Sequence, residues 1–212
     1  MAQLDSTCWT KLKEAVVDDK KRQAFTILYE PVLRTYLEAR WKQPSLTGNI
    51  LPAIQAIFDE SYRQGRALEQ IDSEAQGELR VFLYKIARAI AIKMESDASV
   101  TERIDEDQMA QVFDRTWAVC MMRQAAKMQA ERARGNEKAE RRLQLLRVHF
   151  YGDVPMETIA NLWKTDVNEL DTEYEVAGKE FESALEEVLV FHNPRTWADT
   201  EEESARILAL LG

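Results

Sequence analysis

Apolar side chains recur at intervals of three and four residues through nearly the whole chain. This spacing places them on one face of an α-helix, and no useful stretch shows the alternation of a β-strand. Only 7 glycines and 5 prolines interrupt the sequence, so it encodes few turns and favours long helices. We therefore predict an all-α protein. Its 212 residues suffice for two helical domains of roughly 100 residues each.

The periodicity also predicts where the helices begin and end. Helices are expected over 8–19, 25–41, 51–64, 76–95, 106–134, 138–150, 156–163, 167–191 and 198–211. Pro31 should kink or restart the second helix, and Gly65 should end the third. We expect residues 43–49 to form a loop and Asp166 to cap the helix that begins at residue 167.

The formal net charge of −9 is spread unevenly along the chain. Residues 151–212 carry 4 basic and 15 acidic side chains, whereas residues 101–150 carry 10 and 8. A nucleic-acid-binding domain normally presents a basic face, and the last third of this chain has the opposite charge. No transmembrane run or signal-peptide core is found, and the two cysteines are far apart in sequence. A cytoplasmic protein with reduced thiols and no membrane partner is expected.

The motifs of common catalytic and ligand-binding sites are absent. The two histidines are isolated from each other and from the cysteines, and no phosphate-binding glycine loop or nucleophile elbow occurs. The acidic residues fall mostly on polar helix faces. We therefore expect no enzyme activity, no catalytic residue, no cofactor, no metal and no small-molecule substrate.

Residues 145–181 contain a short helix, a three-residue turn and a longer helix. This is the spacing of a helix-turn-helix, and an ordinary helical hairpin is the alternative. The first helix would be packed by Ile159 and Ala160. The turn would contain Lys164 and Thr165, and the second helix would open with Val167 and Asn168.

Several short motifs occur in a common order. The C-terminal half has Leu145-Leu146-Arg147, Tyr151-Gly152, Pro155 and Glu157-Thr158-Ile159-Ala160. The N-terminal half has Ala24-Phe25, Leu28-Tyr29, Tyr36-Leu37, Gln55 with Ile57-Phe58, Phe82-Leu83-Tyr84 and Ile86-Ala87-Arg88. Taken together, these motifs resemble regions 4 and 2 of the extracytoplasmic-function (ECF) sigma factors over about 140–192 and 20–95.

The resemblance implies an organisation and a function. It implies a region 2-like helical domain over 8–95, a linker with a long helix over 96–135, and a region 4-like helix-turn-helix domain over 136–192. A C-terminal amphipathic helix over 193–212 completes the chain. The implied partners are core RNA polymerase, promoter DNA and an anti-sigma protein. Polymerase would be contacted by Gln55, Ile57 and Phe58, and DNA by Arg80, Tyr84, Lys85, Arg88 and Lys93, with Tyr84 alternatively a core residue.

The expected reading helix carries an unusual charge for that role. From Asp166 to Glu187 it has nine acids and one base, Lys179. Phosphates would repel such a helix, so we predict that the helix-turn-helix alone does not bind DNA. A sigma-like interaction protein that has lost promoter binding is therefore the alternative function. The basic residues within 123–147 would contact phosphates or pair with the acidic helix, and the second interpretation is preferred.

Overall fold

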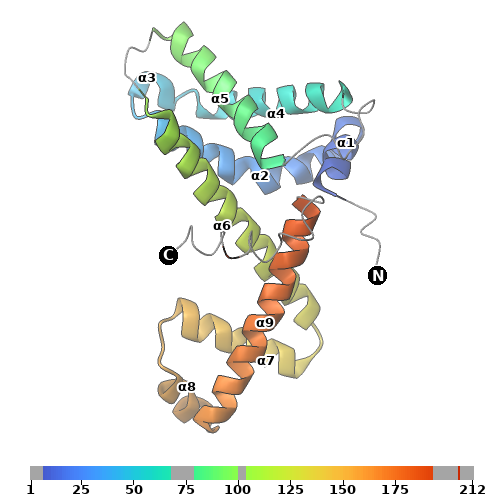
Figure 1. The fold of residues 1–212 in the computed structure, drawn as a ribbon, viewed down its shortest axis with the longest axis vertical. Coiled ribbons are helices and arrows are strands. Elements are labelled where there is room, and N and C mark those ends of the chain that lie inside the picture. The colour runs from blue at the N-terminus through green and yellow to red at the C-terminus, as the bar shows by residue number, and fades with distance from the viewer. Residues whose placement is uncertain (1–6, 68–78, 100–103, 193–204, 206–212) are drawn as a thin grey trace. The chain divides into compact units, whose positions relative to one another are not determined.

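The computed structural model describes residues 7–67, 79–99, 104–192 and 205, with no side-chain detail at 65–67 and 151. Every regular element in these residues is helical, which confirms the all-α prediction for them (Figure 1). Contacts divide the chain into two compact units. Unit 1 comprises Met1–Cys120 and Leu189–Gly212, and unit 2 comprises Met121–Val188.

The helices follow one another with short connections. Unit 1 holds α1 (Cys8–Val17), α2 (Asp19–Arg40), α3 (Pro44–Thr47), α4 (Ile50–Ala67), α5 (Leu79–Asp97) and the first half of α6 (Glu106–Ala133). Unit 2 holds the rest of α6, α7 (Glu137–Leu146), a π-helical turn (Arg147–Tyr151), α8 (Met156–Trp163) and most of α9 (Val167–His192).

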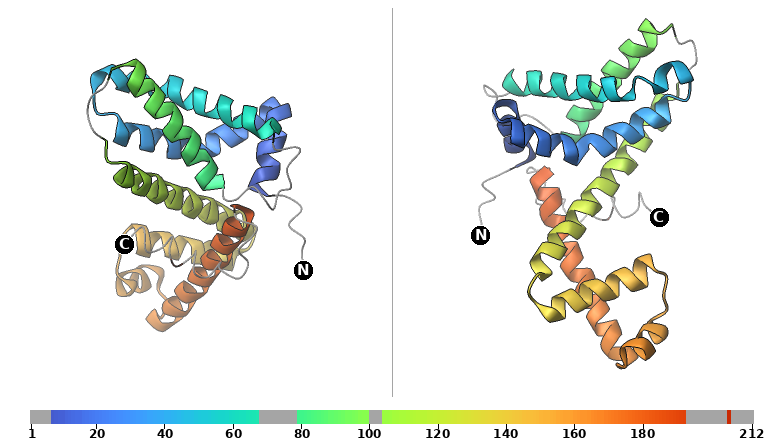
Figure 2. Two further views of the ribbon diagram at one scale, coloured as in Figure 1. Left: turned by 45° about the horizontal axis from the view of Figure 1, so that its top comes forward. Right: turned by 180° about the vertical axis from the view of Figure 1, so that it is seen from behind.

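In unit 1, α1 and α4 both pack on α2, and α5 packs on α4 (Figure 2). The core between them is rich in aromatic rings. Phe25 on α2 contacts both Phe58 and Tyr62 of α4 edge to face, at centroid distances of 6.3 and 6.1 Å. Rings of this size bury much apolar area, and their pairing adds about 0.5–1.5 kcal/mol beyond that area.

The first half of α6 also belongs to this core. Trp117 stacks on Tyr29 with ring centroids 5.5 Å apart, and Phe113 meets the edge of Tyr36 at 5.7 Å. At the end of α9, the buried His192 Nε2 lies 2.8 Å from the Tyr29 hydroxyl. The unit defined by contacts therefore reaches beyond residue 95, because aromatic residues of α6 complete its core.

Capping residues explain several helix starts. The Thr7 side chain accepts a hydrogen bond from the Thr10 amide, and the Thr7 backbone N–H donates to Thr10 Oγ1, which starts α1. Asp18 Oδ1 accepts from the amides of Lys20 and Lys21 and starts α2. Each such cap contributes about 1 kcal/mol.

Three expectations about α2, α3 and α4 need correction. Pro31 does not restart the second helix: α2 runs through it without interruption. Residues 44–47 form α3 instead of a loop, since Pro44 suits a first helical turn and Leu46 is buried. Gly65 does not end α4, which continues to Ala67.

The predicted bounds of the later helices agree in part with the structure. Helix α6 and the break at Gly135 are confirmed, and Gly135 has a left-handed φ of +80°. The helix predicted over 138–150 is shorter, because α7 ends at Leu146 and a π-helical turn follows. The predicted residues 76–78 lie outside the described residues, as does the helix over 198–211 apart from residue 205.

Unit 2 is built around a small apolar core. Its buried members come from α7, α8 and α9: Leu145, Met156, Ile159, Ala160 and Leu170. Between α7 and α8 the chain reverses at Gly152, where an added Cβ would lie 2.5 Å from the Val148 carbonyl oxygen. Only glycine allows this close approach, so the turn fixes how α8 returns onto α7.

Candidate nucleic-acid and partner interfaces

The basic side chains of α5 fall into two classes. The arginines are already paired, because Arg80 Nη1 lies 2.7 Å from Asp114 Oδ1 and Arg88 Nε lies 2.7 Å from Glu106 Oε2. Both carboxylates belong to α6. Lys85 and Lys93 are exposed, and neither has an ion pair within the part of the chain that the structure describes. The free positive charge of α5 therefore comes from its lysines.

Tyr84 is half-buried between two aromatic rings. Its ring lies 5.2 Å from that of Phe113 and 5.9 Å from that of Tyr36. Burial raises the pKa of the Tyr84 hydroxyl, and the nearby Glu106 carboxylate raises it further. Of the two sequence interpretations of this residue, the structure favours a packing role.

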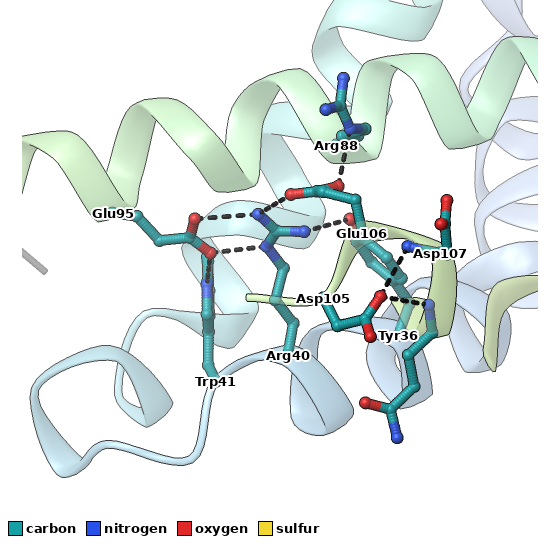
Figure 3. A network of polar contacts seen from close by, with 9 residues as sticks. Tyr36, Arg40, Trp41, Arg88, Glu95, Asp105, Glu106 and Asp107 are labelled. Carbon is teal, nitrogen blue, oxygen red and sulfur yellow. Dashed lines mark hydrogen bonds and ion pairs between the residues drawn. The ribbon is translucent and has the colours of Figure 1, made fainter. Parts of the chain in front are cut away.

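A buried arginine organises the end of α5 (Figure 3). Arg40 donates from Nε and Nη2 to the two oxygens of Glu95, at 2.6 and 2.9 Å. Its Nη2 also lies 2.8 Å from Glu106 Oε1, and Trp41 Nε1 donates to Glu95 Oε1 at 2.8 Å. The network joins α2, α5 and the start of α6, three elements that are distant in sequence.

The electrostatics of this network favour its charged form. Burial by itself would lower the pKa of Arg40, but hydrogen bonds to Glu95 and Glu106 outweigh burial and raise it. Hydrogen bonds from Arg40 and then Arg88 hold the pKa of Glu106 below its ordinary value. Glu106 thus joins the buried guanidinium to an arginine on the surface of α5.

The residues predicted to bind polymerase lie on different faces of α4. Ile57 and Phe58 are 0% and 1% exposed, so they contribute to the core. Gln55 is exposed, and its Nε2 donates to Asp59 Oδ1 at 2.9 Å. Among the three, the structure leaves only Gln55 accessible to a partner.

An open groove of about 790 Å³ runs between α4 and α5. Its floor is apolar, with Phe82, Ile86 and Ile90. Three cations and three acids also line it: Arg63, Lys85, Lys93, Asp59, Glu60 and Asp97. Arg63 is held by Glu60 within α4, at 2.5 Å from Nη2 to Oε1. The two free lysines therefore face a groove with an apolar base.

The residues of the predicted helix-turn-helix lie in α8, in the turn after it and at the start of α9. Ile159 and Ala160 are buried in the core of unit 2, and Val167 packs against it. Lys164 ends α8 in the left-handed region, with φ 53° and ψ 48°. The exposed Asn168 donates its backbone N–H to Asp166 Oδ1 at 2.8 Å, which confirms the predicted cap of α9. Thr165 Oγ1 donates to Glu169 at 2.9 Å and completes the turn.

Acidic side chains cover much of α9. Those at its start are exposed: Asp166, Glu169, Asp171 and Glu175. Further along, Arg142 of α7 binds both Glu173 and Glu180, and Arg132 Nη2 lies 2.5 Å from Glu187 Oε2. Two arginines of the basic segment 123–147, Arg132 and Arg142, thus pair with the acidic helix, as the preferred interpretation predicts. Other cations of the segment remain exposed.

The two cysteines lie in the core of unit 1. Cys8 and Cys120 are buried, and their thiols donate to the carbonyls of His192 and Leu28 at 3.4 Å. Burial raises the pKa of Cys8 to about 12. Within the described ranges, no group of three or more His, Cys, Asp or Glu residues could hold a metal ion, and no helix there could cross a membrane.

No protein-family model, curated protein or solved structure matches this chain.

Sequence reasoning missed the Arg40 network completely. Arg40 closes an amphipathic helix and, in sequence, looks like an ordinary basic residue at a helix C-terminus. Its neighbour Trp41 is a weak signal, because a buried indole N–H needs an acceptor. The partners lie 55 and 66 positions away, which no local pattern records.

Proposed function

We propose that the chain is a sigma-factor-like transcription initiation protein that binds core RNA polymerase and promoter DNA. The observation that carries the proposal is the helix-turn-helix of α8 and α9, with its left-handed Lys164 and its Asp166 cap. The exposed lysines of α5, in the other unit, supply a second feature that this function requires. Neither feature includes catalytic chemistry, so the proposed role is binding.

In this proposal α5 makes the main contact with the promoter backbone. Lys85 and Lys93 are eight residues apart, or about 12 Å along the helix axis. Both line the groove beside α4, and neither charge is neutralised by a described carboxylate. Arg80 and Arg88 hold α5 against α6 through their ion pairs and have a supporting role.

Polymerase would be bound through the outer face of α4. Gln55 offers an exposed amide, and Leu51, one turn earlier, is 62% exposed. An exposed apolar side chain next to a polar one is suited to a protein partner. Ile57 and Phe58 would act by fixing α4 on the core beneath that face.

The test is run-off transcription with core bacterial RNA polymerase. We expect the full-length chain to co-elute with polymerase and to direct transcription from a promoter. Lys85→Glu with Lys93→Glu should lower transcript yield by about tenfold or more while co-elution persists. Lys20→Glu with Lys42→Glu, two exposed lysines elsewhere in unit 1, is the matched control and should change neither.

A second pair of measurements concerns α4. Gln55→Ala should weaken co-elution with polymerase and leave the melting temperature within a few degrees, since the side chain is exposed. Failure of the unaltered chain to co-elute at micromolar polymerase would remove the proposed function. Equal losses from the two lysine pairs would reduce the α5 contact to a general charge effect.

The second candidate is a sigma-like regulatory protein without promoter binding. The exposed carboxylates on the first turns of α9 favour it, because they suit a basic protein surface better than a DNA groove. Co-elution with polymerase or with an anti-sigma protein, together with no transcript and no DNA binding at low salt, would support this candidate over the first.

A further inference from the structure

An exposed row of basic residues follows one ridge of α7 and enters the π-helical turn. Lys138, Arg141, Gln144 and Arg147 are spaced three residues apart, and all four are exposed. Successive residues at this spacing are neighbours on a helix surface, and the row winds around the helix as it rises by about 13 Å. We call these four residues the α7 ridge. Its three cations have no ion pair with any residue that the structure describes.

The neighbouring Arg142 differs from the cations of the ridge, because it forms ion pairs. Arg142 is one residue from Arg141, yet its side chain is 15% exposed and binds two carboxylates of α9. Arg142 therefore neutralises α9, whereas the three cations of the ridge bind no described carboxylate. The charge of the ridge is available to a partner.

A tryptophan orients the central arginine of the ridge. The Arg141 guanidinium lies over the Trp163 ring, 5.5 Å from its centroid. Trp163 packs against the core of unit 2, so the ring is a fixed platform. The ring attracts the guanidinium without using its N–H donors, so these remain for an anion such as phosphate.

The positive surface continues beside the ridge. Arg134 and Arg147 line one open pocket of about 460 Å³, together with Gln144 and Leu143. The carboxylate in that pocket, Glu140, accepts a hydrogen bond from the Gly135 amide at 2.9 Å. Glu137 is the other acid on the exposed side of α7. Cations therefore outnumber acids along this edge of unit 2.

We propose that unit 2 binds the phosphate backbone of duplex DNA through the α7 ridge, and not through α9. The inference rests on the proposed function and names the DNA contact of its second unit. Three exposed cations without a described carboxylate partner, along one short helix and its π-helical turn, fit the repeating charge of a DNA strand, and the ring of Trp163 holds one of them. The carboxylates of α9 keep that helix out of the groove, so binding should be independent of sequence and steep in salt.

The experiment measures binding of a fluorescent random-sequence duplex of about 30 base pairs by fluorescence anisotropy at ~50–200 mM salt. All proteins are full-length and carry Lys85→Gln and Lys93→Gln, which silence α5. This background should bind with a Kd of about 10⁻⁴–10⁻⁶ M near physiological salt, and more tightly at low salt. The ridge triple, Lys138→Gln with Arg141→Gln and Arg147→Gln, should lower the salt slope by about 2.7, from about 0.9 for each lost contact.

The matched control removes three exposed cations of unit 1: Lys20→Gln, Lys42→Gln and Arg115→Gln. It should leave both affinity and slope unchanged. Thermal unfolding of both triples should match the background, because all six side chains lie on the surface. Equal slopes for the two triples, or a strong preference for one promoter sequence, would overturn the inference.

In a third outcome, the α7 ridge would bind an acidic protein instead of DNA. Retention of the background protein on immobilised polyglutamate, with no binding to the duplex, would assign the ridge to a protein surface and overturn the DNA contact. These measurements contain no polymerase. Run-off transcription therefore remains a separate test, and either result can fail while the other holds.

Discussion

Arg40 in unit 1 and Arg142 in unit 2 each join two carboxylates from other helices, but their surroundings differ. The Arg40 side chain is 1% exposed, whereas that of Arg142 is 15% exposed. Arg40 binds Glu95 through two parallel hydrogen bonds, and the Tyr36 hydroxyl accepts a third from Nη1 at 3.2 Å. The buried Nε of Arg142 has no hydrogen-bond partner.

The two networks change the charge of their helices in different ways. In unit 1, Glu106 binds Arg40 and Arg88 together, so an acid of α6 neutralises a base of α5. In unit 2, Arg142 neutralises acids of α9. The comparison teaches that the charge a helix presents to a partner depends on neighbours that its own sequence does not contain.

The largest effect is expected from Arg40→Met, which leaves Glu95 without the guanidinium that it binds. Removing one partner of a buried ion pair costs about 3–5 kcal/mol. Urea denaturation followed by circular dichroism measures the loss. The control Arg34→Met removes a half-exposed pair with Glu30 within α2 and should cost far less. A loss in Arg40→Met no greater than in this control would equate the buried network with a surface pair.

Arg142→Met should cost less, about 1 kcal/mol, because Glu173 and Glu180 are each about a third exposed and water can solvate them. The unpartnered Nε reduces the cost further. The same denaturation experiment ranks the two variants. A loss in Arg142→Met equal to that in Arg40→Met would break the comparison between the networks.

A smaller effect concerns pH. The pKa of Glu106 in the folded chain is lowered from 4.5, chiefly by hydrogen bonds from Arg40. A depressed carboxyl pKa contributes stability above the unfolded value, and that stability is lost as the pH falls through the folded value. Glu106→Gln should therefore lower the unfolding midpoint at pH 7 and differ less from the unaltered chain near pH 3. A gap that widens towards low pH would contradict this sign.

The smallest effect is expected from the pair of Glu60 and Arg63 on α4. Arg63 is 72% exposed, and hydrogen bonds from Arg63 and Gln64 lower the pKa of Glu60. Such a surface pair contributes little, because water and salt screen both charges. Arg63→Ala should leave the unfolding midpoint unchanged at both ~50 and ~500 mM salt. A clear destabilisation would mean that a surface pair of this chain contributes as much stability as a buried pair.

Local signals account for the parts of the fold that could be predicted. The apolar spacing places α6, and the Asp166 cap and the length of α8 follow from residues within one or two helical turns. The candidate site depends more on contacts between helices. The burial of Phe58 and the pairing of Arg88 are set by elements far away in sequence, which no residue pattern encodes.

The errors in helix boundaries have a similar origin. Gly65 is expected to end a helix because glycine favours a helix C-terminus, but this is a weak preference, and α4 continues to Ala67. The π-helical turn at 147–151 depends on the close approach of Gly152 to the Val148 carbonyl, which the sequence shows only as a glycine. The groove between α4 and α5 likewise arises from how two helices pack.

Pro31 lies exposed in the middle of α2 and has no amide hydrogen, so the Ile27 carbonyl lacks its usual donor four residues on. Because both positions are exposed, water can bind that carbonyl, and the helix tolerates the missing bond. The hydrogen-bond ladder is nevertheless weakest there. Under native conditions the two halves of α2 should open separately, giving one block of amide-exchange rates with Phe25 and Tyr29 and another with Tyr36 and Arg40.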